Sequence, residues 1–265
     1  MITAILLAAG YGTRLYPLTK DTPKALLPVG EGVILDQIMR SLETVQGLVK
    51  RILVTNHTFV GQFRNWQRAQ KAQVQILDDG TTSPEMRLGA IRDLELARTQ
   101  GAAQGDLLVV GTDNLFRWPL GGFVARAATH RPAPSVALWQ APSPGAATQF
   151  GVVELDDTGR ITRFVEKSPQ PPSTAVALCV YYFPSPMVGA IPQYLDERRH
   201  TDAPGYFVEW LVSRGAVYGI RIPGAWYDIG TPETYQQVLN TWREIKHGTR
   251  LTSTGGSAVD PGCRG

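Results

Sequence analysis

The feature that most constrains the fold of this chain is an alternation of short apolar runs with longer amphipathic stretches. The runs are almost continuously aliphatic, as in strands buried on both faces, and they are Ile2–Leu7, Arg51–Thr55, Val74–Leu77, Leu107–Val110 and Val136–Trp139. Between them, apolar residues recur three and four positions apart, which predicts helices with one buried face at Leu35, Ile38, Met39, Leu42 and Val45 and at Leu88, Ile91, Leu94, Leu96 and Ala97. This rhythm predicts an α/β fold with a parallel sheet.

The pattern changes after Gln149. Residues 151–167 are typical of a hairpin, and strands are expected at 176–183 and 217–222, with a short buried helix at 207–212. A last helix is expected at Glu233–Lys246, with Thr231 as its N-cap and Gly248 after its end. We therefore expect one domain over 1–248 in two halves, about 1–149 and about 150–248, followed by a disordered tail at 249–265.

Composition excludes several classes of protein. The 265 residues carry 26 Lys and Arg against 23 Asp and Glu, without a basic run that would indicate a nucleic-acid-binding arm. No apolar run approaches the roughly 18 residues that span a membrane, and the N-terminus lacks the basic start of a signal peptide. The two cysteines do not form a disulfide framework, and the four histidines have no zinc-site spacing. We expect a cytoplasmic protein without a nucleic-acid or membrane partner.

A glycine-rich turn follows the first strand. Gly10 and Gly12 allow the backbone to turn tightly and to present N–H groups to an anion, and Arg14 and Lys24 add cationic groups. The turn is neither a Walker A loop nor a dinucleotide fingerprint, because no Gly-Lys-Ser/Thr follows and Leu15 stands in place of the third glycine. From these residues alone, an anion site and an ordinary strand-to-helix turn remain equally good interpretations.

The longer segment Leu7–Gly30 resembles the signature of the sugar-1-phosphate nucleotidyltransferases, L-A-A/G-G-x-G-T-R-L-x-P-L-T…P-K-x-L-x-P-V. The resemblance implies a Rossmann-like three-layer nucleotide-binding sheet with a small mixed β region that binds the sugar. It also implies that Arg14 clamps the β- and γ-phosphates and that Lys24 reaches the reacting phosphoryl group. The nucleotide-binding residues that it implies are Leu7, Ala8, Ala9, Gly10, Gly12, Thr13, Arg14 and Lys24.

Three later segments are similar to the same family, in the same order, so that the resemblance covers residues 1 to about 246. Val109–Phe116 matches the strand end whose aspartate, here Asp113, holds Mg²⁺, and Trp226–Tyr235 matches the segment whose aspartate, here Asp228, completes the metal site. The segments FGVVE and FVEK match the sugar-binding elements and imply sugar-phosphate contacts by Gly151, Glu166 and Lys167. Taken alone, each of these residues is more often a turn, a helix cap or a solvated strand end.

The chain departs from the family pattern in three places. Relatives that use thymidine nucleotides carry a Gln-Pro-x-x-x-G-L-A-type loop after the third strand, whereas here only Gly89-Ala90 retains the expected glycine. Asp79, Thr81 and Thr82 could replace the missing contacts, and we include Asp79 and Gly89 among the expected nucleotide-binding residues. Thr112 and Ser168 are extra residues in the metal and sugar segments. The nucleotide preference therefore stays open.

The resemblance implies a Mg²⁺-dependent enzyme that joins a nucleoside triphosphate to a sugar-1-phosphate and releases pyrophosphate, with Arg14, Lys24 and Lys167 as its catalytic cations. Charge neutralisation and positioning dominate such chemistry, which explains the need for cations and a metal. Two alternatives remain: a cytidylyltransferase that acts on a non-sugar phosphate such as phosphocholine or a phosphonate, and a non-catalytic nucleotide-sensing subunit. The sequence leaves a homo-oligomer as an open alternative.

Overall fold

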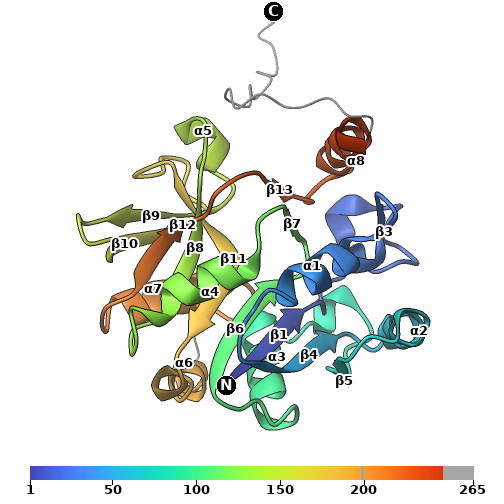
Figure 1. The fold of residues 1–265 in the computed structure, drawn as a ribbon, viewed down its shortest axis with the longest axis horizontal. Helices are drawn as coiled ribbons and strands as arrows, with labels where there is room; N and C mark the ends of the chain where they lie inside the picture. Colours follow the sequence, from blue (N-terminus) through green and yellow to red (C-terminus); the bar gives the residue numbers. More distant parts are fainter. Residues whose placement is uncertain (198–199, 247–265) are drawn as a thin grey trace, which may run out of the picture.

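The centre of the molecule is a nine-stranded sheet in a computed structural model that describes residues 1–197 and 200–246. Four neighbouring strands are parallel, in the order β5 (Gln75–Asp78), β4 (Leu48–Thr55), β1 (Ile2–Leu7) and β6 (Asp106–Gly111) (Figure 1). Three of them contain an apolar run of the sequence, and β5 overlaps the run Val74–Leu77 without including Val74. The expected α/β fold with a mostly parallel sheet is confirmed.

Helices cover both faces of these parallel strands because successive side chains of each strand point to opposite faces. One core packs Ala4, Leu6 and Leu53 against α1 (Ile34–Leu42), α2 (Val60–Gln70) and α4 (Leu120–Ala128). The other packs Ile5, Ile52 and Val54 against α3 (Ala90–Thr99), α6 (Ala190–Asp196) and α7 (Pro204–Val212). The three layers implied by the family resemblance are therefore present.

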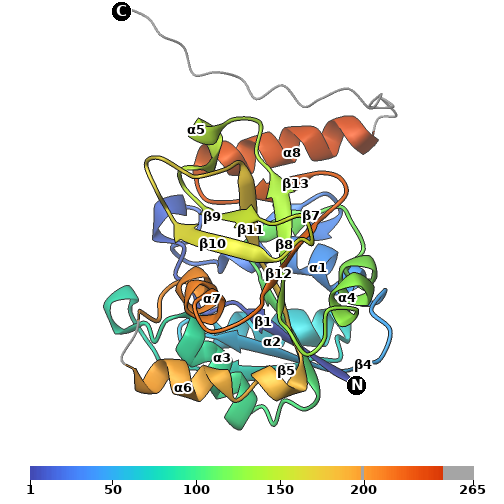
Figure 2. The same ribbon diagram turned by 90° about the vertical axis from the view of Figure 1, so that its left-hand side faces the viewer.

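The second half of the chain extends the same sheet. The long strand β11 (Ala175–Phe183) runs antiparallel to β6 at its C-terminal end and to β9 (Gly151–Leu155) at its N-terminal end, and it pairs with β8 (Ser135–Gln140) at both ends. The expected hairpin is present as β9 and β10 (Ile161–Glu166), and β12 (Tyr218–Arg221) lies parallel to β8 (Figure 2). The mixed β region is thus joined to the parallel strands through β11.

Two short antiparallel ribbons lie outside the central sheet, and one of them joins distant parts of the sequence. One pairs β7 (Asn114–Phe116) with β13 (Trp226–Asp228), and the other pairs β2 (Pro28–Val29) with β3 (Gly32–Val33). The last helix, α8 (Pro232–Lys246), begins at the expected cap, where the Thr234 amide donates to Thr231 Oγ1 at 3.3 Å. These contacts place the C-terminal part of the described chain beside its N-terminal loop.

The remaining elements are short. They are α5 (Pro144–Ala147) and 3₁₀ turns at Thr13–Leu15, Lys24–Leu26, Pro84–Met86 and Ser185–Met187. Within the described residues, no helix is both long and apolar enough to cross a membrane. The expected tail at 249–265, and Gly248 before it, lie outside the residues that the structure describes.

Candidate functional site

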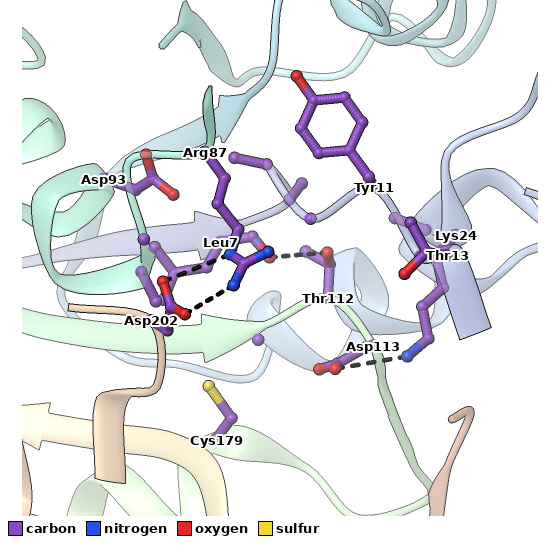
Figure 3. A pocket seen from close by; sticks show the side chains of 18 of the residues that line it. Leu7, Tyr11, Thr13, Lys24, Arg87, Asp93, Thr112, Asp113, Cys179 and Asp202 are labelled. Atoms are coloured by element: carbon purple, nitrogen blue, oxygen red, sulfur yellow. Dashed lines mark hydrogen bonds and ion pairs between the residues drawn. The ribbon is translucent and has the colours of Figure 1, made fainter. Parts of the chain in front are cut away.

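A cavity of about 350 Å³ opens at the carboxyl ends of β1 and β6, where a parallel sheet usually binds its ligand (Figure 3). It brings together the residues expected to bind the nucleotide and one residue expected to bind metal. Those that line it are Leu7, Ala8, Ala9, Gly10, Gly12, Thr13, Arg14, Lys24, Asp79, Gly89 and Asp113. Segments that are more than 100 residues apart in the sequence thus form one wall.

The glycine loop is held in place by hydrogen bonds from the scaffold around it. Gly12 has a φ of +62°, in the left-handed region that favours glycine, and its carbonyl accepts from Thr19 Oγ1 at 2.7 Å. The buried Asn56 donates to the Ala9 carbonyl at 3.0 Å. A Cβ on Gly10 would meet nothing within 4 Å, so the backbone there faces open space. The loop is therefore rigid and can closely approach a bound group.

Lys24 and Asp113 form an ion pair across the cavity. Lys24 Nζ lies 3.4 Å from Asp113 Oδ2, and the lysine side chain is mostly buried while the aspartate is about half exposed. Asn114 donates to Asp113 Oδ1 at 2.8 Å and in turn accepts a hydrogen bond of 2.7 Å from Trp226 Nε1. The aspartate is thus oriented by a chain of buried hydrogen bonds and is charge-paired from the N-terminal loop.

The β7–β13 ribbon brings the second expected metal ligand beside the first. Asp228 pairs in register with Asn114, the residue that follows Asp113. Burial raises the pKa of Asp228 and the Asp113 carboxylate raises it further, whereas Lys24, Arg14 and Lys167 lower it. These five charged residues, which come from five separate segments, therefore interact in one electrostatic cluster.

Two carboxylates suit a magnesium ion. Among the described residues, no group of three or more His, Cys, Asp and Glu side chains could enclose a metal. Mg²⁺ usually binds through only one or two carboxylates and completes its shell with water and substrate phosphates. The mutual repulsion of Asp113 and Asp228 is the kind of strain that a divalent cation relieves. The chemistry of the pair fits such an ion.

The residues expected on the sugar side lie next to this cavity without lining it. Gly151 and Glu166 are register partners in the β9–β10 hairpin, and the Glu166 side chain is only 9% exposed. It is packed against Gly151 and Gly205, where any Cβ would clash with its carboxylate. Burial raises the pKa of Glu166, and the Lys167 ammonium, 3.9 Å away, opposes this shift.

Lys167 ends the hairpin in a left-handed conformation, with a φ of +50° and a side chain that is 61% exposed. Its amide donates to the Phe150 carbonyl at 3.1 Å, which fixes the turn. The Lys167 ammonium is close enough to lower the pKa of Asp228 and the pKa of Asp202. It therefore lies between the sugar-side carboxylate and the cavity.

The two insertions relative to the family pattern have local structural roles. Thr112 Oγ1 and the Thr112 amide both donate to the Leu7 carbonyl, at 2.8 and 3.1 Å, and tie the end of β6 to the end of β1. Ser168 Oγ donates to the Gln170 carbonyl at 3.0 Å and accepts from the Gln170 amide at 3.1 Å. Both residues stabilise the loops that carry Asp113 and Lys167.

Several cavity residues were not expected from the sequence. Arg87 and Asp202 form an ion pair of 2.8 Å between the loop before α3 and the loop before α7. Next to this pair, the Thr201 carbonyl accepts from the Ile91 amide at 3.1 Å. A Cβ on Gly89, whose φ is +91°, would lie 2.7 Å from the Thr201 backbone. Thus the retained glycine lets this loop dock on the start of α3.

Asp93 is another cavity residue that was not expected. It lies one turn into α3, is 5% exposed, and lines the cavity. Its Oδ1 has no hydrogen-bond partner in the described part of the chain, and burial, helped by the nearby Asp79, raises its pKa to about 8. The available sequence signal was a charged residue within the apolar stripe of a helix, between Ile91 and Leu94.

Asp79, Thr81 and Thr82 lie in the loop after β5 and were expected to replace the missing nucleotide contacts. Two of them, Asp79 and Thr81, are hydrogen-bonded to each other. Asp79 Oδ1 accepts from the Thr81 amide and from Thr81 Oγ1, both at 2.7 Å, and Tyr11 OH donates to Thr81 Oγ1 at 3.1 Å. Burial raises the pKa of Asp79 despite these bonds. The side chain of Thr82 is exposed and donates to Met86 Sδ at 3.5 Å. Of these three residues, only Asp79 lines the cavity.

Comparisons with known proteins agree with the arrangement. Residues 3–244 match the family described as Nucleotidyl transferase, which confirms the resemblance identified in the sequence. The chain is 26% identical over 234 residues to the bifunctional protein GlmU of Methanococcus aeolicus, covering 86% of this chain and 51% of that protein. It is also 26% identical over 234 residues to the mannose-1-phosphate guanylyltransferase catalytic subunit beta of Drosophila melanogaster, covering 88% and 60%.

A solved structure has the same fold. A UDP-glucose pyrophosphorylase complexed with UDP-glucose superposes with a TM-score of 0.75 at 18% identity, over 92% of this chain and 100% of that one. The chain spans between half and three fifths of the length of the two curated relatives. Those relatives therefore contain sequence beyond the part that is shared.

Proposed function

We propose that this chain, which belongs to the nucleotidyl transferase family, transfers a nucleotidyl group from a nucleoside triphosphate to a sugar-1-phosphate and releases pyrophosphate. The observation that carries the proposal is the convergence of Arg14, Lys24 and Lys167 with the carboxylates of Asp113 and Asp228 beside one cavity. The curated relatives and the structural neighbour are consistent with it, since two of them are named for a sugar phosphate or a nucleotide sugar.

The reaction requires two anions to meet. An oxygen of the sugar phosphate attacks the α-phosphorus of the triphosphate, the bond from that phosphorus to the β-phosphate oxygen breaks, and pyrophosphate carries away the electron pair. Because attacker, centre and leaving group are all negatively charged, catalysis consists mainly of alignment and charge neutralisation. A phosphate oxygen is already nucleophilic, so no activating base is required.

The cations divide this work by position. Arg14 and Lys24 lie on the glycine-loop side of the cavity and neutralise the phosphates of the donor, including the leaving pyrophosphate. Lys167 approaches from the hairpin and neutralises the phosphate of the acceptor, while the Glu166 carboxylate, which packs against Gly151, accepts hydroxyl groups of the sugar. The glycine loop and Gly89 allow the base and ribose to pack against the backbone.

Asp113 and Asp228 would hold a Mg²⁺ ion, which would neutralise phosphate oxygens and align the donor. Lys24, paired with Asp113 at 3.4 Å, would then exchange that contact for the phosphates of the donor. Asn114 and Trp226 keep the aspartate in position during this exchange.

A pyrophosphate-release screen tests the function. Purified protein with Mg²⁺ is given each of dTTP, UTP, CTP, GTP and ATP with each of glucose-, mannose-, galactose- and N-acetylglucosamine-1-phosphate, and with phosphocholine. Stoichiometric pyrophosphate release that depends on one sugar-1-phosphate is expected. Release only with phosphocholine, or nucleotide binding without release for any acceptor, would contradict the proposal in favour of a cytidylyltransferase or a nucleotide sensor.

A further inference from the structure

The carboxylate of Asp93 is a buried polar group that the proposed mechanism does not use. The residue is 5% exposed, its Oδ1 has no hydrogen-bond partner among residues 1–197 and 200–246, and the residue lines the nucleotide cavity. An unpaired buried carboxylate is expensive, so such groups are usually found where a ligand supplies the missing partners.

The charged groups around Asp93 do not satisfy it. Asp79, from the end of β5, is a second carboxylate and repels it. Arg87, from the preceding loop, donates to Asp202 from both Nε and Nη2, at 3.4 and 2.8 Å. Arg92, the neighbour of Asp93 on α3, is exposed. None of these side chains donates to Asp93 in the described structure.

The position of Asp93 assigns it to one end of a bound nucleotide. Figure 3 shows Asp93 and Asp202 toward one end of the cavity, and Thr13 and Lys24 toward the other. The triphosphate is attracted to the end with Lys24. The end that contains Asp93 is therefore left for the nucleoside. Gly89, which precedes α3, also lines the cavity.

The hydrogen-bonding pattern of the bases distinguishes them at such a group. Guanine carries two adjacent donors, N1–H and N2–H, which can both reach one carboxyl group and which favour its ionised form over the protonated form that burial favours. Adenine, cytosine, uracil and thymine present an acceptor next to a donor on the same edge, and that acceptor would face a carboxylate oxygen. A site built from buried acceptors rejects a ligand that leaves them unpaired.

From this geometry we propose that Asp93 selects the base of the donor nucleotide and that this base is guanine, bound through N1–H and N2–H. The inference rests on the proposed function, because it assumes that the cavity binds a nucleoside triphosphate. Asp93 contacts the base, which lies away from the reacting phosphorus, so its substitution alters the choice of nucleotide more than the rate with the chosen one.

The variant Asp93→Asn supplies a gain-of-function test. The asparagine replaces one acceptor with an N–H donor of nearly the same size. Xanthine has N1–H next to the O2 acceptor, so the variant matches XTP as the wild type matches GTP. We expect kcat/KM for GTP to fall by about 10²-fold or more and kcat/KM for XTP to rise by a similar factor, since the new N–H donor faces guanine N2–H but is accepted by xanthine O2. ITP, which lacks N2–H, should be used by the wild type at least about tenfold less well than GTP.

A matched control lies on the same helix. Glu95→Gln makes the same chemical change at a residue that pairs with Arg98 at 2.6 Å and does not line the cavity. Its nucleotide preference should equal that of the wild type. The melting temperature of each variant shows that it is folded.

Calorimetric titration of GTP and XTP without an acceptor separates the two proposals. The wild type could prefer GTP and Asp93→Asn could prefer XTP, with no pyrophosphate release for any acceptor. That result would support base selection and contradict the transfer function. Turnover of UTP, dTTP, CTP or ATP with a preference that Asp93→Asn leaves unchanged would overturn base selection alone. Asp93→Asn could instead change the preference for an NTP over its 2′-deoxy-NTP equally for every base. That result would also overturn base selection, since Asp93 would then contact the ribose.

Discussion

The buried carboxylate of Asp93 makes the stability of the protein depend on pH in a way that one substitution removes. Its pKa is about 8 in the fold, against 3.8 for the ordinary group. Between these values the unfolded chain has lost the proton that the folded chain still holds, so the free energy of unfolding falls as pH rises. Asp93→Asn cannot titrate, so the variant should gain stability relative to the wild type across this range.

The size of the effect follows from the two pKa values. Each unit of difference corresponds to about 1.4 kcal/mol, so the full gain of Asp93→Asn approaches about 6 kcal/mol above pH 8. Near pH 4 the carboxyl is only about half ionised in the unfolded chain, so the two proteins should be equally stable within about 1 kcal/mol. Relaxation around the charged group lowers the upper figure, and a gain of several kcal/mol is the expected outcome.

Urea unfolding followed by tryptophan fluorescence at pH 5, 6, 7 and 8 measures this difference without nucleotide. The gap between Asp93→Asn and wild type should widen at every step. Glu95→Gln, which removes an ion pair on the surface side of α3, should lower stability by less than about 1 kcal/mol. A gap for Asp93→Asn that is the same at all four pH values would refute the burial of an unpaired carboxylate.

Three further outcomes are expected. Asp113→Asn and Asp228→Asn should each lower kcat by about 10² or more with an unchanged melting temperature, because the fold does not depend on the charge that they supply; wild-type rates in either variant would remove that residue from the metal site. Lys167→Met should raise KM for the sugar-1-phosphate by about tenfold or more, because the acceptor phosphate loses a cation. Equilibrium titration should show an unchanged Kd for the nucleotide. A higher nucleotide Kd would place Lys167 on the donor side. Gly89→Ala should lower the free energy of unfolding in urea by about 1–3 kcal/mol, since its Cβ would meet the Thr201 backbone and its φ of +91° favours glycine. The same substitution should weaken nucleotide binding. An unchanged nucleotide Kd would contradict a contact between the nucleotide and the start of α3.

The parallel strands were predictable because each is buried on both faces and therefore carries an unbroken apolar run. The strand β1 begins and ends at the predicted residues, and β6 differs by one residue at each end. The helix boundaries were less accurate. Val45 lies beyond the end of α1, and Leu88 precedes Gly89, whose backbone conformation starts α3. Periodicity identifies a buried face, whereas caps and glycines set where the helix stops.

The β7–β13 ribbon was not predicted, although it is the element that joins the two expected metal ligands. Each strand has three residues, too few for a periodic pattern, and the pairing of Asn114 with Asp228 spans the mixed β region. The order of the motifs suggested that the two aspartates act together. Only the folded chain shows how they are brought close.

Asp93 could not be identified as a site residue from the sequence because its significance lies in what it lacks. A charged residue in an apolar helix stripe is commonly paired with a neighbour, and here Asp79 and Arg87 are both near enough in sequence to suggest partners. In the structure Asp79 is bound by Thr81 and Arg87 by Asp202. Whether a buried carboxylate is satisfied is a property of the tertiary fold.

The central claim is that this cavity moves a nucleotidyl group onto a sugar phosphate, and the fate of two labels tests it most directly. The protein is incubated with Mg²⁺, the accepted sugar-1-phosphate and the triphosphate labelled with ³²P at either the α- or the γ-phosphate. Label from the α-position is predicted to appear in the nucleoside diphosphate sugar, and label from the γ-position in pyrophosphate, in equal amounts. Label from the γ-position in a sugar product, or in inorganic phosphate without a nucleotide sugar, would contradict the claim.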